Sequence, residues 1–113
     1  MHERSLCGAI ADITTRRAEG RPVGVVHLAV GQLRQVVPDS LTFCWSMLTE
    51  GTELDGSVLD LVPVPARLRC LACENEFALD DPPAFVCPGC GALNVAVLTG
   101  EEFVVTELEF ARA

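Results

Sequence analysis

Four cysteines form two pairs with the spacing of a metal-binding ribbon. They are Cys70 and Cys73, then Cys87 and Cys90, separated by residues 74–86. Each Cys-x-x-Cys turn lets two thiolates converge on one cation, and a loop of this length can bring the two turns together. Four thiolates in tetrahedral geometry favour Zn(II), which would act as a structural staple for a short insertion. Rubredoxin-like iron sites use the same ligands, so iron stays open as an alternative.

The first three residues offer nitrogen ligands for a second metal. The Met1 amine, the His2 ring and the backbone amides of His2 and Glu3 can surround one small divalent ion in a plane. Square-planar nitrogen ligation favours Ni(II) or Cu(II). Copper binds such sites more tightly, so selection for nickel would have to come from delivery and availability. The competing interpretation is that His2 is simply part of a frayed terminus.

The other candidate residues have simpler structural interpretations. Cys7 and Cys44 fall at helix positions that suit small hydrophobic side chains, which predicts buried thiols. His27 is predicted to be a packed or edge histidine outside the metal sites, and Asp39 to be a helix cap. No Ser/His/Asp arrangement, phosphate-binding glycine loop or pair of catalytic carboxylates can be assembled from the sequence. We therefore expect that the protein is not an enzyme.

The composition disfavours nucleic-acid binding and membrane insertion. Eight Lys and Arg against sixteen Asp and Glu give a net charge of −8, which suits metal cations or a basic protein partner. No apolar run approaches the ~20 residues of a membrane span, and the first dozen residues do not form a secretory signal. Six cysteines are then better explained as ligands or buried thiols than as disulfides. We expect a cytoplasmic protein.

Apolar periodicity predicts two helices. The first covers about residues 5–17, where apolar positions repeat at helical spacing and charged residues lie on the opposite side. The second begins near Pro38, because proline suits the first helical turn, and ends before Gly51.

Three strands and an inserted ribbon complete the predicted fold. The strands are expected at residues 23–30, 57–64 and 103–110. Pro63 and Pro65 restrict the second strand to a sheet edge or to a strand end. The predicted class is therefore α+β, a small three-stranded sheet with two helices plus an inserted zinc-ribbon domain. The predicted domains are a discontinuous nickel-binding domain, 1–66 with 97–113, and a zinc-binding domain, 67–96.

Several short stretches, in this order, resemble the HypA/HybF family of hydrogenase nickel-incorporation proteins. They are Met1-His2-Glu3 followed by Ser5-Leu6, then Val36-Val37-Pro38-Asp39-Ser40-Leu41, Thr49-Glu50-Gly51-Thr52 and the ribbon with Cys87-Pro88-Gly89-Cys90-Gly91. The likeness covers nearly the whole chain. Each stretch is short, but their joint order and the chain length make the resemblance specific.

The resemblance implies a nickel metallochaperone. Family members work with a GTPase partner to fill the large subunit of nickel-iron hydrogenase, and some also serve urease. The family's nickel motif falls on Met1, His2 and Glu3, and its zinc ligands fall on the four paired cysteines. The implied fold is two helices on a three-stranded sheet, with a zinc domain inserted before the last strand. A homodimer is compatible with this resemblance.

The chain departs from some relatives at two places. Where those relatives have histidines beside the cysteine pairs, this chain has Glu74 and Gly91, which argues against a histidine-swapping switch. Where some relatives carry an auxiliary carboxylate before the second helix, this chain has Val36 and Val37. Two other classes of protein compete with a nickel carrier: a zinc-ribbon adaptor that contacts protein or RNA, and a rubredoxin-like electron carrier.

Overall fold

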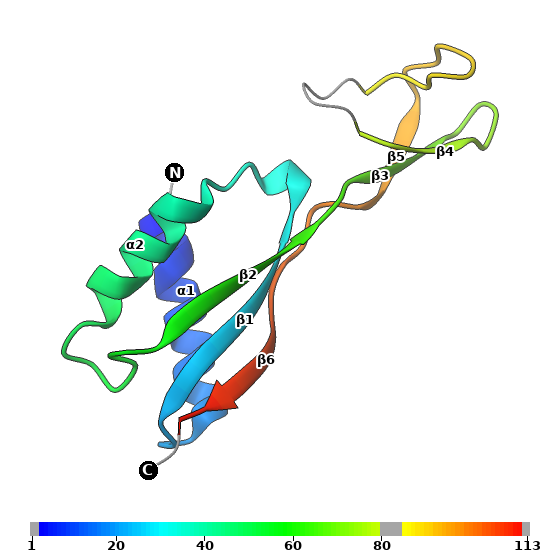
Figure 1. Ribbon diagram of the computed structural model, residues 1–113. Helices are drawn as coiled ribbons and strands as arrows, with labels where there is room; N and C mark the ends of the chain where they lie inside the picture. Colours follow the sequence, from blue (N-terminus) through cyan, green and yellow to red (C-terminus); the bar gives the residue numbers. More distant parts are fainter. Residues whose placement is uncertain (1–2, 80–84, 112–113) are drawn as a thin grey trace. The chain divides into compact units, whose positions relative to one another are not determined.

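The computed structural model describes residues 3–79 and 85–111, without the side chain of Glu3 (Figure 1). Met1 and His2 lie outside the described residues. The chain divides into two compact units, and each is described by itself. The first unit comprises Met1–Ala29, Val36–Val62 and Phe103–Ala113, and the second comprises Val30–Gln35 and Pro63–Glu102.

The secondary structure contains two α-helices, one 3₁₀ turn and six strands among the described residues. In chain order they are α1 (Glu3–Ala18), β1 (Val23–Gly31), η1 (Gln32–Arg34), α2 (Pro38–Thr49), β2 (Val58–Val64), β3 (Arg67–Cys70), β4 (Glu76–Ala78), β5 (Val95–Thr99) and β6 (Phe103–Phe110). None of the described helices has the length and apolar character needed to cross a membrane.

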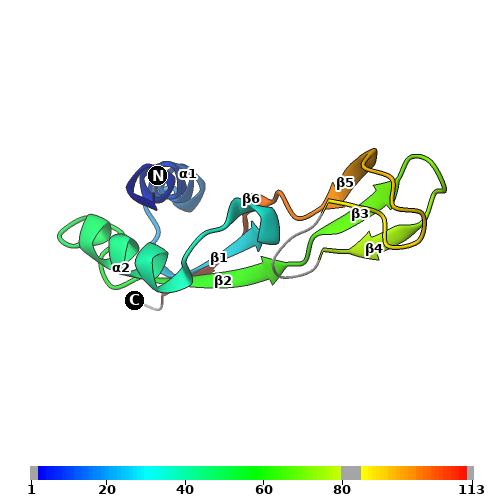
Figure 2. The ribbon, with the colours of Figure 1, turned by 90° about the horizontal axis from the view of Figure 1, so that it is seen from above.

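The first unit packs α1 and α2 together beside a three-stranded sheet of order β2-β1-β6 (Figures 1 and 2). Strands β1 and β6 run in opposite directions, because Gly31 N–H bonds Glu102 O at one end and Ala111 N–H bonds Pro22 O at the other. Side chains from both helices and all three strands are buried: Cys7, Ile10, Val26, Leu28, Leu41, Trp45, Leu59 and Val105. The Trp45 Nε1–H donates to Ser57 Oγ at 3.0 Å, so the largest core side chain keeps its hydrogen bond.

The start of α2 corrects one prediction from the sequence. Pro38 occupies the first helical turn as expected, but the N-cap residue is Val37, which makes no side-chain capping bond. Asp39 already lies inside the helix, so the prediction that it caps the helix is wrong. The reason is that an N-cap residue has an extended backbone, and the helix starts two residues too early for Asp39 to fill that position. Gly51 follows the last turn with φ 78°, as predicted.

The second unit is a smaller sheet of order β4-β3-β5, antiparallel at both pairings. Its core combines side chains of the strands with two of the paired cysteines: Ala66, Leu68, Cys70, Phe77, Leu79 and Cys87. Leu33 of η1, Ala92 and Val95 pack against this cluster. The unit therefore has a hydrophobic core that includes two sulfur atoms.

Two glycines allow close backbone approach in the second unit. A β-carbon at Gly31 would lie 2.0 Å from the carbonyl oxygen of Gly100, so the position excludes every side chain. Gly100 itself has φ +117°, and its own β-carbon would lie 2.8 Å from Ala66. Leu33 N–H donates to Gly100 O at 2.8 Å, which fixes the crossing.

The predicted fold class is confirmed, including the edge position of β2, the strand that contains Pro63. The sequence predicted a ribbon but did not predict its three strands, β3, β4 and β5, as separate elements. The functional division into a nickel-binding domain, 1–66 with 97–113, and a zinc-binding domain, 67–96, stays a prediction.

Candidate metal centre

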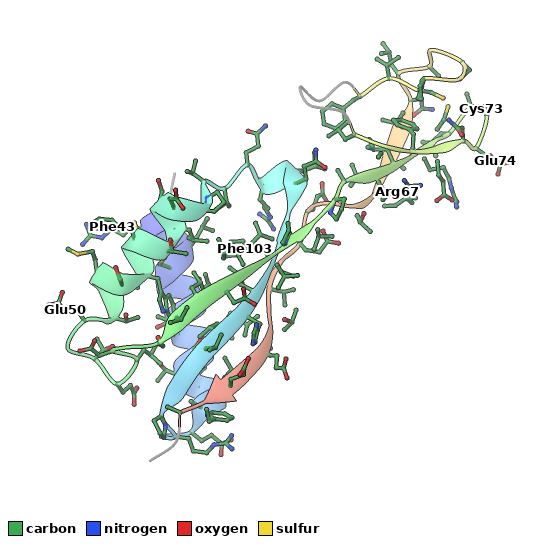
Figure 3. The ribbon with its side chains drawn as sticks, viewed as in Figure 1. Phe43, Glu50, Arg67, Cys73, Glu74 and Phe103 are labelled. Carbon is green, nitrogen blue, oxygen red and sulfur yellow. The ribbon has the colours of Figure 1, made fainter. Side chains whose placement is uncertain are left out.

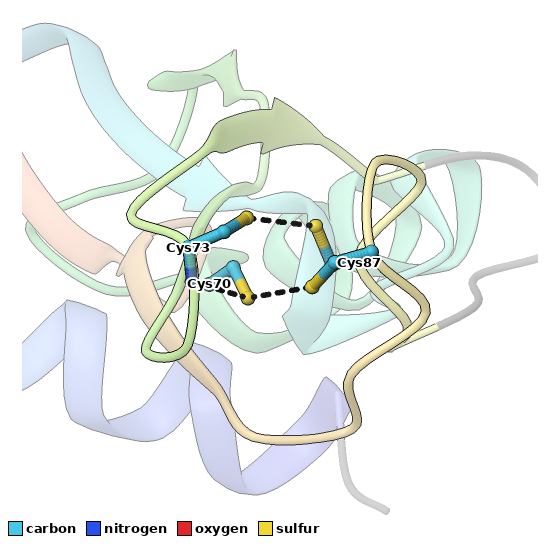
Figure 4. Close-up of side chains that lie close together, drawn as sticks. Cys70, Cys73 and Cys87 are labelled. Atoms are coloured by element: carbon cyan, nitrogen blue, oxygen red, sulfur yellow. Dashed lines mark hydrogen bonds between the residues drawn. The ribbon is translucent and has the colours of Figure 1, made fainter.

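The four paired cysteines converge in the second unit (Figure 4). Their sulfur atoms all lie within 4.8 Å of one another, with 3.5 Å between Cys70 and Cys90 and 3.6 Å between Cys73 and Cys87. A disulfide requires about 2.05 Å, so these contacts are not disulfides. A tetrahedral zinc ion at about 2.3 Å from each sulfur would place neighbouring sulfurs about 3.8 Å apart. The arrangement therefore fits one tetrahedral ion with little rearrangement.

The first knuckle is built by backbone hydrogen bonds around Cys70. Cys70 ends β3, and its Sγ accepts N–H bonds from Ala72 at 3.4 Å and Cys73 at 3.5 Å. The chain then turns back, with Glu74 N–H donating to Cys70 O at 2.9 Å and Cys70 N–H to Asn75 O at 2.8 Å. Glu74 reaches this turn with φ 64°, in the left-handed region that favours glycine.

The second knuckle repeats the pattern around Cys87. Gly91 N–H donates to Cys87 O at 2.8 Å, and Cys87 N–H donates to Ala92 O at 3.0 Å. Gly91 has φ 75° at the position equivalent to Glu74. The Nδ2 of Asn75 also approaches Cys87 Sγ at 3.8 Å, a contact from the first knuckle to the second that the sequence did not predict.

Within each knuckle the first cysteine is buried and the second is exposed. Cys70 and Cys87 are 0% and 1% exposed and belong to the hydrophobic core, whereas Cys73 and Cys90 are exposed. Cys73 and its neighbour Glu74 lie at the tip of the loop between β3 and β4 (Figure 3). The centre is thus anchored on its core side and open on the other.

The hydrogen bonds divide the four thiols into two acidic and two weakly acidic groups. The backbone N–H of Cys90, then that of Gly89, lowers the pKa of Cys87 to about 6, although burial opposes this. The N–H of Cys73 likewise lowers the pKa of Cys70.

The second cysteine of each knuckle behaves in the opposite way. At Cys90 the N–H of Ala92 acts to lower the pKa, but contact with the Cys70 thiol and burial raise it to about 12. The pKa of Cys73 is raised as well, because contacts with Cys87 and Cys70 outweigh the N–H of Asn75. A divalent cation favours the thiolate form of all its ligands, so metal binding would release the protons that the second cysteines hold.

Of the predicted amino-terminal site, the structure describes only the backbone of Glu3. Met1 and His2 are outside the described residues, and Glu3 is the first residue of the helix. The first N–H groups of a helix have no partner within it, so the Glu3 amide is not committed to an α-helical hydrogen bond. Arg4, the next residue, and Cys7, one turn further, line an open groove of about 460 Å³ with apolar residues of α2: Phe43, Cys44, Met47 and Leu48.

The two helical cysteines differ from each other. Cys7 is fully buried, as predicted, and its Sγ lies 3.5 Å from Leu41 O. Cys44 is only half-buried, so the prediction of a buried thiol is wrong there. Helix α2 turns this part of its surface outward, as the neighbouring Phe43 shows with 66% exposure (Figure 3).

The fold and the centre together define a class: a small two-unit protein that joins an α/β unit to a four-cysteine metal ribbon. The protein family described as hydrogenase/urease nickel incorporation, metallochaperone, hypA matches residues 1–110. The chain belongs to this HypA family. The prediction that it is not an enzyme agrees with membership of a family of metallochaperones.

Relatives and solved structures agree with this assignment. The hydrogenase maturation factor HypA of Geotalea uraniireducens is 46% identical over 112 residues, which cover 96% of this chain and 98% of that protein. HypA of Streptomyces avermitilis is 38% identical over 114 residues, covering 97% and 87%. The solution structure of the nickel metallochaperone HypA from Helicobacter pylori has a TM-score of 0.69 at 21% identity and covers 97% of each chain, which shows a shared fold.

Proposed function

We propose that this chain binds Ni(II) with its amino terminus and delivers it to the large subunit of a nickel-iron hydrogenase. The observation that carries the proposal is the family match, which begins at residue 1 and so includes the Met1-His2-Glu3 motif. The ligands would be the Met1 amine, the His2 ring and the amides of His2 and Glu3. Delivery would take place in the cytoplasm with a nickel-handling GTPase as partner, and urease is the other target that the family description allows.

The position of α1 supports this ligand set. The helix begins at Glu3, so the Glu3 amide nitrogen is free of an intrahelical bond and can ligate a metal. Two deprotonated amides also neutralise the charge of Ni(II). The positive end of the helix dipole therefore does not oppose the bound ion. A site made from three terminal residues can exchange its donors one at a time, which suits a carrier that must release its cargo.

We propose that the four-cysteine centre holds a structural Zn(II). Cys70, Cys73, Cys87 and Cys90 would be its ligands, and backbone N–H groups already point at the sulfurs of Cys70 and Cys87. Two of these sulfurs belong to the core of their unit, so metal binding and folding of the ribbon are linked. Metal analysis of protein purified from iron-replete cells distinguishes zinc from iron. The colour of the same protein is a second readout, because a rubredoxin-like iron centre would be red.

A titration calorimetry experiment tests the nickel site. Protein with a native terminus is compared with its His2→Ala variant and with protein acetylated at the Met1 amine. Both changes should weaken Ni(II) binding by at least about 100-fold, because each removes one donor of a four-nitrogen plane. Zinc content should stay at one ion per chain. His27→Gln is the matched control, since it removes the other histidine of the chain and should leave Ni(II) binding unchanged. Undiminished binding after acetylation would reject the assignment.

A further inference from the structure

His27 connects all three strands of the β2-β1-β6 sheet. It lies on the central strand, and its Nδ1 is 2.7 Å from Oδ2 of Asp60 on β2. Its Nε2 contacts Oε2 of Glu109 on β6. The ring is 19% exposed, whereas the two carboxylates are 51% and 58% exposed. A partly shielded imidazole is thus held between two solvated acids, one from each edge strand.

Only the protonated ring satisfies both contacts. A carboxylate can accept hydrogen bonds but cannot donate them, and a neutral imidazole has one N–H to give. The imidazolium form donates on both sides and adds charge attraction to each bond. Accordingly the hydrogen bonds to Glu109 and then to Asp60 raise the pKa of His27, against a smaller opposing effect of burial. Among the described residues, the charged groups that act on the ring are these two acids.

The three strands that meet at His27 are also the strands from which the chain enters and leaves the second unit. Strand β1 runs directly into η1, and β2 ends at Val64, shortly before β3 begins at Arg67. Strand β5 ends at Thr99, and β6 begins at Phe103. Three of the four places where the chain passes between the two units lie at or near the ends of these strands, and the fourth lies between Gln35 and Val36.

We propose that His27, Asp60 and Glu109 form a proton-dependent clasp that holds the three strands together and loosens as the medium becomes alkaline. The clasp contributes stability that is fully present below about pH 6.5, the ordinary pKa of histidine, and that is lost as the pH rises through the raised value. Below about pH 4 the carboxylates themselves take up protons, which sets the acid limit. The clasp uses none of the residues assigned to the two metal sites, so it is independent of the proposed nickel chemistry.

Nitrogen NMR of the histidine rings tests the clasp directly. Zinc-loaded, nickel-free full-length protein is titrated from about pH 5 to pH 9, and His2 provides an internal reference because the chain has two histidines. His27 should carry both ring protons below its midpoint, and that midpoint should lie above about 6.5. Asp60→Asn and Glu109→Gln should each lower it. Glu107→Gln, which changes another exposed carboxylate of β6, is the matched control and should leave it in place.

Thermal unfolding supplies a second measurement on the same proteins. The melting temperature of the wild type should fall between about pH 6 and pH 9, and His27→Gln should show a smaller fall over that range. Three results would each overturn the proposal: a His27 midpoint at or below about 6.5, a midpoint that either carboxylate variant leaves unchanged, or an undiminished pH dependence in His27→Gln. Nickel binding plays no part in these readouts, so they are separate from the test of the carrier function.

Discussion

The two cysteine knuckles have the same backbone design but different residues at its most constrained position. In both, the N–H of the fourth residue after the first cysteine closes the turn onto that cysteine's carbonyl oxygen, at 2.9 Å in one and 2.8 Å in the other. In both, that residue has a left-handed backbone. It is Glu74 in the first knuckle and Gly91 in the second.

Because two different residues adopt it in the same turn, the hydrogen-bond pattern, and not the residue, dictates the left-handed conformation. Such a backbone costs roughly 1–2 kcal/mol for a residue with a side chain and almost nothing for glycine. The first knuckle therefore holds strain that the second lacks. The shared burial of Cys70 and Cys87 in the core, together with metal binding, can support that strain.

Removing a buried cysteine should have the largest effect, and the effect should be similar in the two knuckles. Cys70→Ser and Cys87→Ser each delete a ligand and place a hydroxyl in the core, so zinc affinity should fall by more than about 100-fold. Amide exchange should show protection lost in β3, β4 and β5 and kept in the β2-β1-β6 sheet. Cys44→Ser, which lies outside both knuckles, should retain zinc. A ribbon that stays protected without a core cysteine would show that its folding does not depend on metal.

Adding a side chain to the relaxed knuckle should have the next largest effect. Gly91→Ala should lower the unfolding free energy of the zinc-loaded protein by about 1–2 kcal/mol. The cost is that of the backbone conformation alone, since a β-carbon at this position meets no atom within 4 Å. Denaturant unfolding measures it. Gly89→Ala is the control in the same knuckle: its β-carbon makes only ordinary contacts near 3.7 Å, so it should cost less.

Relieving the strained knuckle should give a smaller change of opposite sign. Glu74→Gly should raise the unfolding free energy by about 0.5 kcal/mol, because the gain from the left-handed backbone exceeds the extra entropy of glycine in the unfolded chain. Glu74→Ala removes the same carboxylate and keeps the strain, so it should be close to neutral in the same denaturant series. A loss of stability in Glu74→Gly would mean that the first knuckle is not strained.

The contact between the knuckles should have the smallest effect. Asn75→Ala removes the Nδ2 group 3.8 Å from Cys87 Sγ, which helps to lower the pKa of that thiol. Zinc affinity measured by competition with a chelator should fall by only about 2-fold, because such a weak contact contributes less than an ordinary hydrogen bond. Asn94→Ala, which changes the asparagine beyond the second knuckle, should have no effect. If Asn75→Ala and Asn94→Ala changed zinc affinity equally, the contact between Asn75 and Cys87 would have no specific role.

Features that depend on local sequence were predicted well. The end of the second helix before Gly51, the edge position of the strand containing Pro63, and the pairing of cysteines all follow from the properties of single residues or short spacings. The helix cap was predicted wrongly because Asp39 is a common capping residue, whereas Pro38 and Val37 decide where the helix starts.

Features that depend on contacts distant in sequence were not predicted. His27 was expected to be packed or at an edge, but its partners Asp60 and Glu109 lie 33 and 82 positions away. In β6, Val104 is exposed and Val105 is buried, a choice that the alternation along the strand does not decide. Periodicity identifies two faces of a strand, while the packing of α1 and the sheet order decide which of them is covered.

The crossing of Gly31 and Gly100 sets a condition for protein engineering. A designer who transplants the ribbon into a new host would naturally copy the four sulfurs and the strands that carry them. A β-carbon at Gly31 would lie only 2.0 Å from the Gly100 carbonyl oxygen, so both glycines must be copied together with the strands. Neither glycine is close in sequence to the four paired cysteines. A graft that starts after Gly31 would keep Gly100 but lack the glycine against which it packs.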